Sequence, residues 1–270
     1  MGPDSFTEDD VRAGAKALSG WREPRTQAMI DAGLKRQQMR TGQPPRVTPT
    51  ADTVKTGVYM PQRGYRGAPF AFLGETKSWS TDAVLDKILQ QDATAPFIVR
   101  RLLVNFVTPY PSDAYVARLA GAYRKTRYDT KALVRDILTS PEFTAADTYR
   151  VLIKSPTELM IHTAKALGDR TLTRLIAGQG QGMGQTLFDP PSVGGWPENE
   201  SWVSSNTMLA RANFVTSAVQ AVRRLPPAGN AHNTQIDGVM SAQTLKLLNA
   251  AADDRRRWAI LLASPEFQLK

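Results

Sequence analysis

The sequence contains no cysteine and only two histidines, His162 and His232. The lack of cysteine excludes disulfide bonds and thiolate chemistry. Structural zinc sites usually take four Cys or His ligands, so two histidines argue strongly against such a site. A cysteine-free chain suits either redox environment, and the composition therefore leaves the cellular compartment open.

Long apolar stretches are also missing, since no run approaches the ~18 residues of a membrane span. Residues 1–5 lead directly into a helix start signal, so this chain shows no signal peptide. Two interpretations follow: a cytoplasmic protein, or a piece of a longer protein that begins upstream. The 41% of hydrophobic and 22% of charged residues are typical of a globular protein with a real core.

Acidic residues are too few to balance the basic ones, and the net charge is +9. Residues 22–77 hold ten Lys or Arg against four Asp or Glu, so ten minus four gives +6 of this excess. Such a segment suits nucleic acid, anionic lipid or an acidic polymer as partner. No nucleic-acid motif accompanies the charge, which favours a solvated insertion whose charges keep it soluble.

Proline and glycine divide the chain into short helical segments. Thr7, Ser80 or Thr81, Ser112 and Asp129 each precede a helical pattern as an N-cap should. We therefore predict a mainly α fold, an irregular multi-helix bundle forming one domain over residues 1–270. A loop-rich basic insertion occupies residues 22–78, with a short helix at 27–40. Within it, residues 58–60 and 70–73 are predicted to pair as one small β-hairpin.

Two predicted helices carry apolar stripes that indicate their buried faces. The helix at 95–107 places Val99, Leu103 and Phe106 on one side. The helix near 205–223 has apolar residues at spacings of four and three, which predicts a seam that faces the core. That seam comprises Met208, Ala212, Val215, Val219 and Val222. A further pair of helices is predicted at 242–252 and 253–262.

A Ser-Pro-Glu-Phe pattern ends residues 137–143 and recurs at 261–267, and Ser155–Glu158 is a close variant. The residue before proline leaves the α region, which ends the incoming helix. Serine as N-cap, proline at the first helical position and glutamate in the first turn then begin the next helix. The repeated pattern therefore predicts corners between helices, with a capping box from Ser155 to Glu158.

Evidence for catalysis is sparse. No GxSxG motif occurs, and His162 and His232 are the only imidazole bases. His162 follows Glu158 by four residues on a predicted helix, and His232 lies in a polar stretch predicted to be a loop. The glycine run from Gly178 to Gly184 superficially resembles a phosphate-binding loop. A helix precedes it where such a loop needs a strand, which favours a helix terminator and hinge.

The most informative segment is a loop rich in Trp, Pro and Gly at residues 183–203, which leads into a helix. Indoles offer flat apolar faces with one N–H donor and suit a shallow ligand site. The candidate ligand-binding residues are Gln185, Asp189, Trp196, Trp202, Asn206 and Arg211. The alternative is a rigid Ω-type loop whose tryptophans plug the core and whose Arg211 ties down carbonyls.

Calcium is the one cofactor for which the sequence offers candidate ligands, namely Asp189, Glu198, Asn199 and Glu200. Their spacing fits no EF-hand. No other cofactor is implied.

Several motifs resemble the bacterial domain-of-unknown-function family numbered 1800, in its C-terminal half. They lie in one order along nearly the whole chain: residues 6–21, 96–102, 138–143, 154–159, 183–196 and 209–213. The resemblance implies a largely helical protein, usually longer than this chain and often exported, with no settled activity. Many relatives carry a His-Asp pair before the turn at Phe72–Gly74, where this chain reads Gln62–Pro69 without one.

Two classes of function remain open on this basis. The first is a non-catalytic binding or scaffold protein, exported as the resemblance implies, that uses the tryptophan loop and basic segment on an envelope polymer or partner protein. The second is a hydrolase of an ester, lactone or glycosidic bond with its pocket at the same loop. No convergent acid–base set is visible, which favours the first class.

Overall fold

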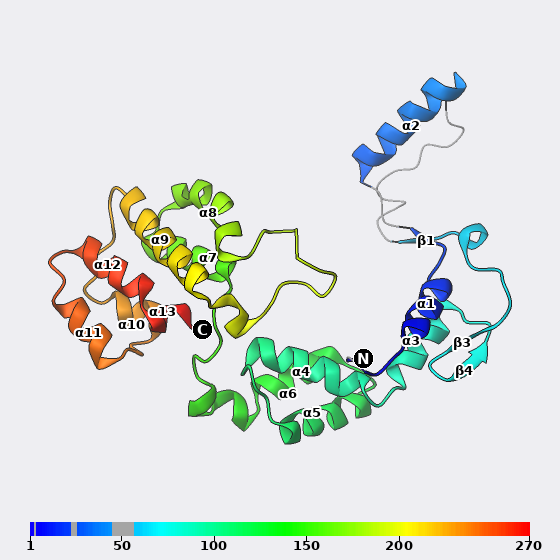
Figure 1. The fold of residues 1–270 in the computed structure, drawn as a ribbon, viewed down its shortest axis with the longest axis horizontal. Coiled ribbons are helices and arrows are strands. Elements are labelled where there is room, and N and C mark those ends of the chain that lie inside the picture. The colour runs from blue at the N-terminus through cyan, green and yellow to red at the C-terminus, as the bar shows by residue number, and fades with distance from the viewer. Residues whose placement is uncertain (3, 23–25, 45–56) are drawn as a thin grey trace. The chain divides into compact units, whose positions relative to one another are not determined.

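The computed structural model describes residues 1–2, 4–22, 26–44 and 57–270, and it confirms the mainly α class (Figure 1). No helix among these residues is long and apolar enough to cross a bilayer. The chain divides into two compact units, residues 1–98 and 99–270. We describe each unit by itself, and the single domain stays a prediction.

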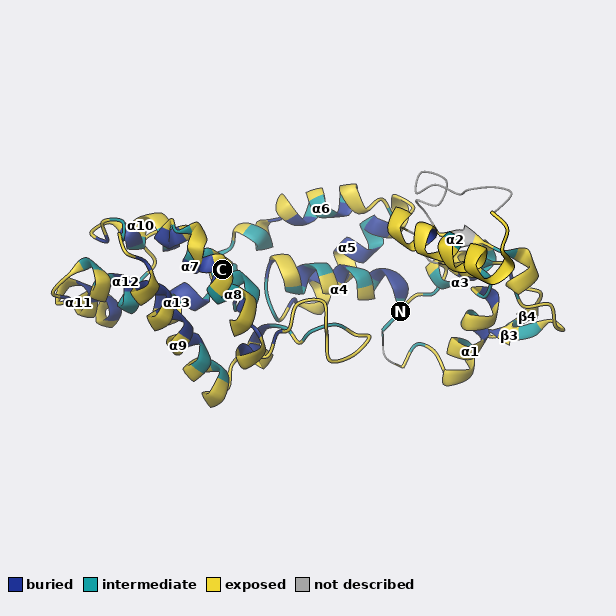
Figure 2. Ribbon diagram, turned by 90° about the horizontal axis from the view of Figure 1, so that it is seen from above, coloured by how far each residue is buried: buried dark blue, intermediate teal, exposed yellow. Residues whose placement is uncertain are grey.

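The first unit contains α1 (Glu8–Ala17), α2 (Gln27–Thr41) and α3 (Thr81–Leu89). The predicted caps are present, because Thr7 accepts from the backbone of Asp10 and Ser80 from that of Ala83. Helix α2 confirms the helix predicted inside the basic insertion. It is exposed along nearly its whole length (Figure 2), and Ile30 is its one buried residue.

Two short antiparallel pairs accompany these helices. Strand β1 (Trp21–Arg22) pairs with β2 (Val58–Tyr59), and β3 (Phe70–Phe72) pairs with β4 (Glu75–Lys77). The predicted pairing of 58–60 with 70–73 is therefore wrong. Between β3 and β4, Leu73 and Gly74 have φ of 45° and 78°, as a tight two-residue turn requires. Because this turn closes β3 onto its immediate successor, a local partner replaces the distant one.

The core of the first unit is small and is built around two aromatic rings. Phe72 and Trp79 meet edge to face with ring centroids 5.3 Å apart, packed with Ala13, Ala17 and Val84. The indole Nε1 of Trp79 donates to the carbonyl of Phe70 at 3.1 Å. This contact holds the β3–β4 hairpin against the helices.

The second unit begins within α4 (Thr94–Phe106) and continues through α5 (Asp113–Lys125) and α6 (Thr130–Leu138). Val99 and Leu103 are fully buried as predicted. Phe106 is 48% exposed, so its predicted burial is wrong. The next residue, Val107, enters the core in its place, because the chain leaves the helix at this point.

The larger core lies among α7 (Pro156–Leu167), α8 (Thr173–Gln179) and α9 (Ser205–Ala221), with the helices that follow. Those helices are α10 (Ala231–Ile236), α11 (Ala242–Asn249), α12 (Asp254–Ala263) and α13 (Pro265–Gln268). Helices α9 and α12 pack side by side (Figure 1).

Helix α9 buries three of the five predicted seam residues, Val215, Val219 and Val222. Met208 and Ala212 are exposed, which contradicts their predicted place in the core seam. The seam begins at Arg211, which is 1% exposed, and continues through Phe214, Val215, Ala218, Val219 and Val222. The first turn of the helix lies beyond the apolar core, so its side chains face solvent.

The Ser-Pro corners have the predicted structural role. Ser140, Ser155 and Ser264 each act as an N-cap and accept a hydrogen bond from the backbone three residues later. Ser155 and Glu158 form the complete capping box at the start of α7. The corner at Pro141–Thr144 continues as a 3₁₀ helix instead of an α-helix.

Candidate functional site

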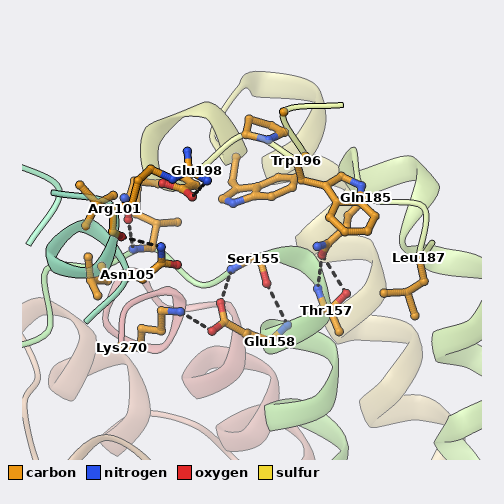
Figure 3. A pocket seen from close by; sticks show the side chains of 18 residues that line it. Arg101, Asn105, Ser155, Thr157, Glu158, Gln185, Leu187, Trp196, Glu198 and Lys270 are labelled. Carbon is orange, nitrogen blue, oxygen red and sulfur yellow. Dashed lines mark hydrogen bonds and ion pairs between the residues drawn. The ribbon is translucent and has the colours of Figure 1, made fainter. Parts of the chain in front are cut away.

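A pocket of about 460 Å³ lies beside the tryptophan loop of the second unit (Figure 3). Its volume is within the range of small-molecule sites, about 300–1,000 Å³. Five separate segments form its wall: α4 with Arg101 and Asn105, the residues around Ser155, Gln185, the stretch from Gly194 to Trp202, and Lys270. Three of the predicted ligand residues, Gln185, Trp196 and Trp202, are among them.

Gln185 is held firmly in this wall, with only 8% of its surface exposed. Its Oε1 accepts from the backbone N of Thr157 at 2.9 Å and from the Thr157 hydroxyl at 2.8 Å (Figure 3). The amide Nε2 of Gln185 has no partner among the described residues, although it belongs to a nine-tenths buried side chain that lines the pocket. This nitrogen is not among the buried unpaired atoms, so it is open to the pocket, where a bound molecule can accept a hydrogen bond from it.

The glycine run explains how Gln185 reaches this position. The carbonyl of Gly180 accepts from the backbone N of Gln185 at 2.9 Å. A Cβ at Gly180 would lie 2.4 Å from the Gln185 carbonyl oxygen, so no side chain fits there. Gly184, with φ of 90°, ends the short helical turn that follows α8. The run thus ends a helix, as predicted, and also places a pocket residue.

The two tryptophans differ in burial. Trp202 is 5% exposed, whereas Trp196 is only partly buried. The indole Nε1 of Trp196 is itself buried and has no hydrogen-bond partner. Asn199 lies between them with φ of 48°, and its Oδ1 accepts from the backbone N of Ile153 at 3.4 Å. The pocket wall therefore offers apolar indole surface, while the unpaired N–H of Trp196 is enclosed by the protein.

The charged side chains that line the pocket are arranged as two ion pairs. Arg101 lies 3.5 Å from Glu198, and Lys270 contacts Glu158 (Figure 3). Burial by itself would raise the pKa of the Glu158 carboxyl. Hydrogen bonds from Lys270 and from the backbone N of Ser155 outweigh burial and hold that pKa below its ordinary value. The Glu158 carboxylate is therefore an ionised partner of Lys270 at neutral pH.

The remaining predicted ligand residues lie elsewhere. Asp189 and Asn206 are exposed and do not line the pocket, and neither does the buried Arg211. Glu200 accepts from the hydroxyl of Tyr110 at 2.8 Å. The predicted calcium ligands are not brought together, because no group of three or more His, Asp or Glu residues in the described part of the chain could hold a metal ion.

Arg211 instead joins α9 to the C-terminal segment. Its two terminal nitrogens donate to the Gln268 side chain at 2.9 Å and to the Lys154 carbonyl at 2.8 Å. The Nζ of Lys154 in turn donates to the carbonyls of Phe267 and Leu269, each at 2.5 Å. Burial lowers the pKa of Lys154 to about 7, and the nearby Arg150 cation adds to the effect. These bonds bring Lys270 to the pocket wall.

The tip of the loop is exposed. Phe188 is 95% exposed with φ of 64°, Leu187 is 50% exposed, and Val193 is fully exposed. Of the two tryptophans that the Ω-loop alternative places in the core, only Trp202 is buried. The two ends of the loop line the pocket, while its tip contacts little of the protein.

Neither histidine lines the pocket. His162 lies on α7, and its ring is 4.4 Å from that of Phe267 between centroids. Burial is the largest cause that lowers the pKa of His162. His232 lies in the short helix α10, so the loop predicted for it is wrong.

Sequence reasoning missed Arg101, Asn105 and Lys270 as pocket residues. They come from segments far apart in the chain, and no local signal marks them. The pairing of Glu158 with Lys270 was also not predicted, because the sequence indicates only local roles for Glu158, as a helix cap and as a neighbour of His162 on the same helix.

Comparison with known proteins supports the resemblance seen in the sequence. The family model described as Protein of unknown function (DUF1800) matches residues 1–269. Searches of the curated proteins and of the solved structures found no match to this chain. Because the family model covers nearly every residue, the chain belongs to the DUF1800 family.

Proposed function

We propose that this chain is a non-catalytic binding module that holds a segment of an envelope polymer in the pocket beside the tryptophan loop. The observation that carries the proposal is Gln185, a nine-tenths buried side chain whose Nε2 lines the pocket without a partner. Because Nε2 is not among the buried unpaired atoms, it is open to the pocket and can donate to a bound molecule. A ligand with an acceptor oxygen at this position would take the hydrogen bond in place of water.

The tryptophans support the same proposal. Trp196 and Trp202 provide flat apolar surface, and Trp196 adds a second N–H without a partner. Aromatic walls with a few fixed polar groups are characteristic of ligand sites. The proposal includes export, which the family resemblance implies, because an envelope polymer lies outside the cytoplasm.

A hydrolase is the alternative, since Glu158 and Glu198 line the same pocket. A general acid must keep its proton at neutral pH, which requires a raised pKa. The pKa of Glu158 is lowered instead, and Glu198 is paired with Arg101. Neither His162 nor His232 reaches the pocket to act as a base. These observations favour binding without turnover.

The experiment is co-sedimentation of the purified chain with insoluble bacterial envelope polymers. We expect Trp196→Ala to weaken binding about tenfold or more, as loss of a central aromatic contact does. Trp21→Ala is the matched control, because Trp21 is an exposed tryptophan of the first unit. Retained binding by Trp196→Ala would contradict the proposal, and steady release of soluble fragments would favour the hydrolase.

A further inference from the structure

The net charge of +9 suggests an acidic polymer as ligand, but the pocket has a different balance. Its two cations, Arg101 and Lys270, are each paired with a carboxylate, Glu198 and Glu158. The side chains lining the pocket therefore sum to no net charge. An anionic ligand entering here would have to displace Glu198 or Glu158 from its cation and would be repelled by it.

The unused hydrogen-bonding groups of the pocket are uncharged. The amide Nε2 of Gln185 is open to the pocket, whereas the indole Nε1 of Trp196 is buried and meets a ligand only if the indole shifts. Both are donors, so they require acceptor oxygens from the ligand. Hydroxyl and amide carbonyl oxygens meet this need without bringing a charge that must lose its hydration.

The apolar part of the pocket wall sets a further requirement for the ligand. Trp196, Trp202 and Leu152 present carbon surface to the same space. The ligand must therefore carry acceptor oxygens at its edge and an apolar face, with no net charge. A pyranose ring has this combination, since its C–H bonds form apolar patches and its oxygens project from the rim.

We propose that the pocket takes a neutral sugar unit of the polymer and discriminates against sugars that carry a carboxylate. This inference rests on the proposed binding function and names its ligand class. Glu198 and Glu158 supply the discrimination, because each keeps its cation from serving as an anion site. The basic residues outside the pocket take no part in it.

The test compares soluble oligosaccharides of equal length by titration calorimetry with the full chain. The neutral probes are cellotriose and chitotriose, and the anionic probe is trigalacturonate. We expect the better neutral probe to bind at least tenfold more tightly than trigalacturonate. Its affinity should change less than twofold between 50 and 500 mM NaCl, since no ion pair forms with the ligand.

Glu198→Gln sharpens the test, because it leaves Arg101 without its carboxylate. In this variant the affinity for trigalacturonate relative to the neutral probe should rise about tenfold, and the gain should disappear in high salt. Glu200→Gln is the matched control: it removes a nearby carboxylate that contacts Tyr110 and does not line the pocket. Circular dichroism melts of both variants would verify that they fold.

Trigalacturonate binding as tight as that of the neutral probes would overturn the ligand class, as would an unchanged ratio in folded Glu198→Gln. The binding function would still stand if Trp196→Ala abolished polymer co-sedimentation. If Trp196→Ala co-sedimented with the polymer as well as the wild type, the binding function itself would be overturned, whatever the sugar. The two failures are therefore distinguishable.

Discussion

The buried cations of the second unit and the cations of its pocket are held by different groups. Arg211 and Lys154 are 1% and 5% exposed, and they bond to carbonyl oxygens and to the Gln268 amide. Arg101 and Lys270 lie at the pocket wall and pair with carboxylates. Dipolar acceptors orient a cation without cancelling its charge, whereas a carboxylate neutralises it.

This difference has consequences for both regions. The buried cations fix the C-terminal segment. The pKa of Lys154 falls because burial removes its hydration and the Arg150 cation repels its charge, which the Glu158 carboxylate only partly offsets. The pocket pairs remain partly exposed, so they contribute little stability, and we propose that their role is to set which ligand charge the pocket accepts. Three predictions test the comparison.

The largest effect is expected at Arg211. Arg211→Ala should lower the free energy of unfolding by about 3–5 kcal/mol, because it opens a cavity and leaves two buried acceptors without donors. Arg211→Met fills most of the volume and should cost about half as much. Urea denaturation measures both. A loss below about 1 kcal/mol in Arg211→Ala would show that these hydrogen bonds do not hold the segment.

A smaller effect is expected where the glycine run meets the pocket. Gly180→Ala should destabilise the chain by about 1–3 kcal/mol, because its Cβ would clash with the Gln185 carbonyl and force the backbone to move. Gly182→Ala is the matched control, since a Cβ there meets nothing within 4 Å. The melting temperatures should separate the two variants, and polymer binding should fall only in Gly180→Ala. Equal melting temperatures and equal polymer binding in the two variants would show that Gly180 is not needed to position Gln185.

The third effect is a pH dependence at Lys154. Its pKa is about 7 in the folded chain against an ordinary 10.5, so between these values the unfolded chain holds a proton that the folded chain has lost. The free energy of unfolding therefore rises with pH between about 7 and 10.5, and it falls again as the pH is lowered toward 7. The slope due to Lys154 is at most about 1.4 kcal/mol per pH unit.

Urea denaturation of the wild type and Lys154→Met at pH 7, 8.5 and 10 measures this dependence. The difference in unfolding free energy should shift in favour of the wild type as pH increases. A constant difference across the three pH values would mean that Lys154 keeps its proton in the folded chain.

Local chemistry was sufficient to predict where most helices begin. Thr7, Ser112 and Asp129 cap helices as expected, because a side-chain oxygen satisfies a backbone N–H only a few residues away. The stripe on α9 was predicted less well. The periodicity was correct, but Met208 is exposed and Arg211 takes a core position, because what covers a helix face depends on distant segments.

The candidate site was predicted only in part. Gln185, Trp196 and Trp202 were identified from their unusual loop, and they do line one pocket. Asp189 and Asn206 belong to the same sequence neighbourhood but point to solvent. Asp189 lies in the irregular loop, where no fixed period governs the direction of a side chain, and Asn206 lies in the solvent-facing first turn of α9.

The sequence by itself determined the helical class, the corners at the Ser-Pro motifs and the family, because these depend on local caps and on motif order. Only the tertiary structure decided that α4, Gln185, Trp196 and Lys270 share one pocket, since Arg101 of α4 and Lys270 lie 169 residues apart in the chain. It also decided which cations meet carboxylates and which meet carbonyls. The composition gives the number of charged residues, but only the folded structure determines which groups they pair with.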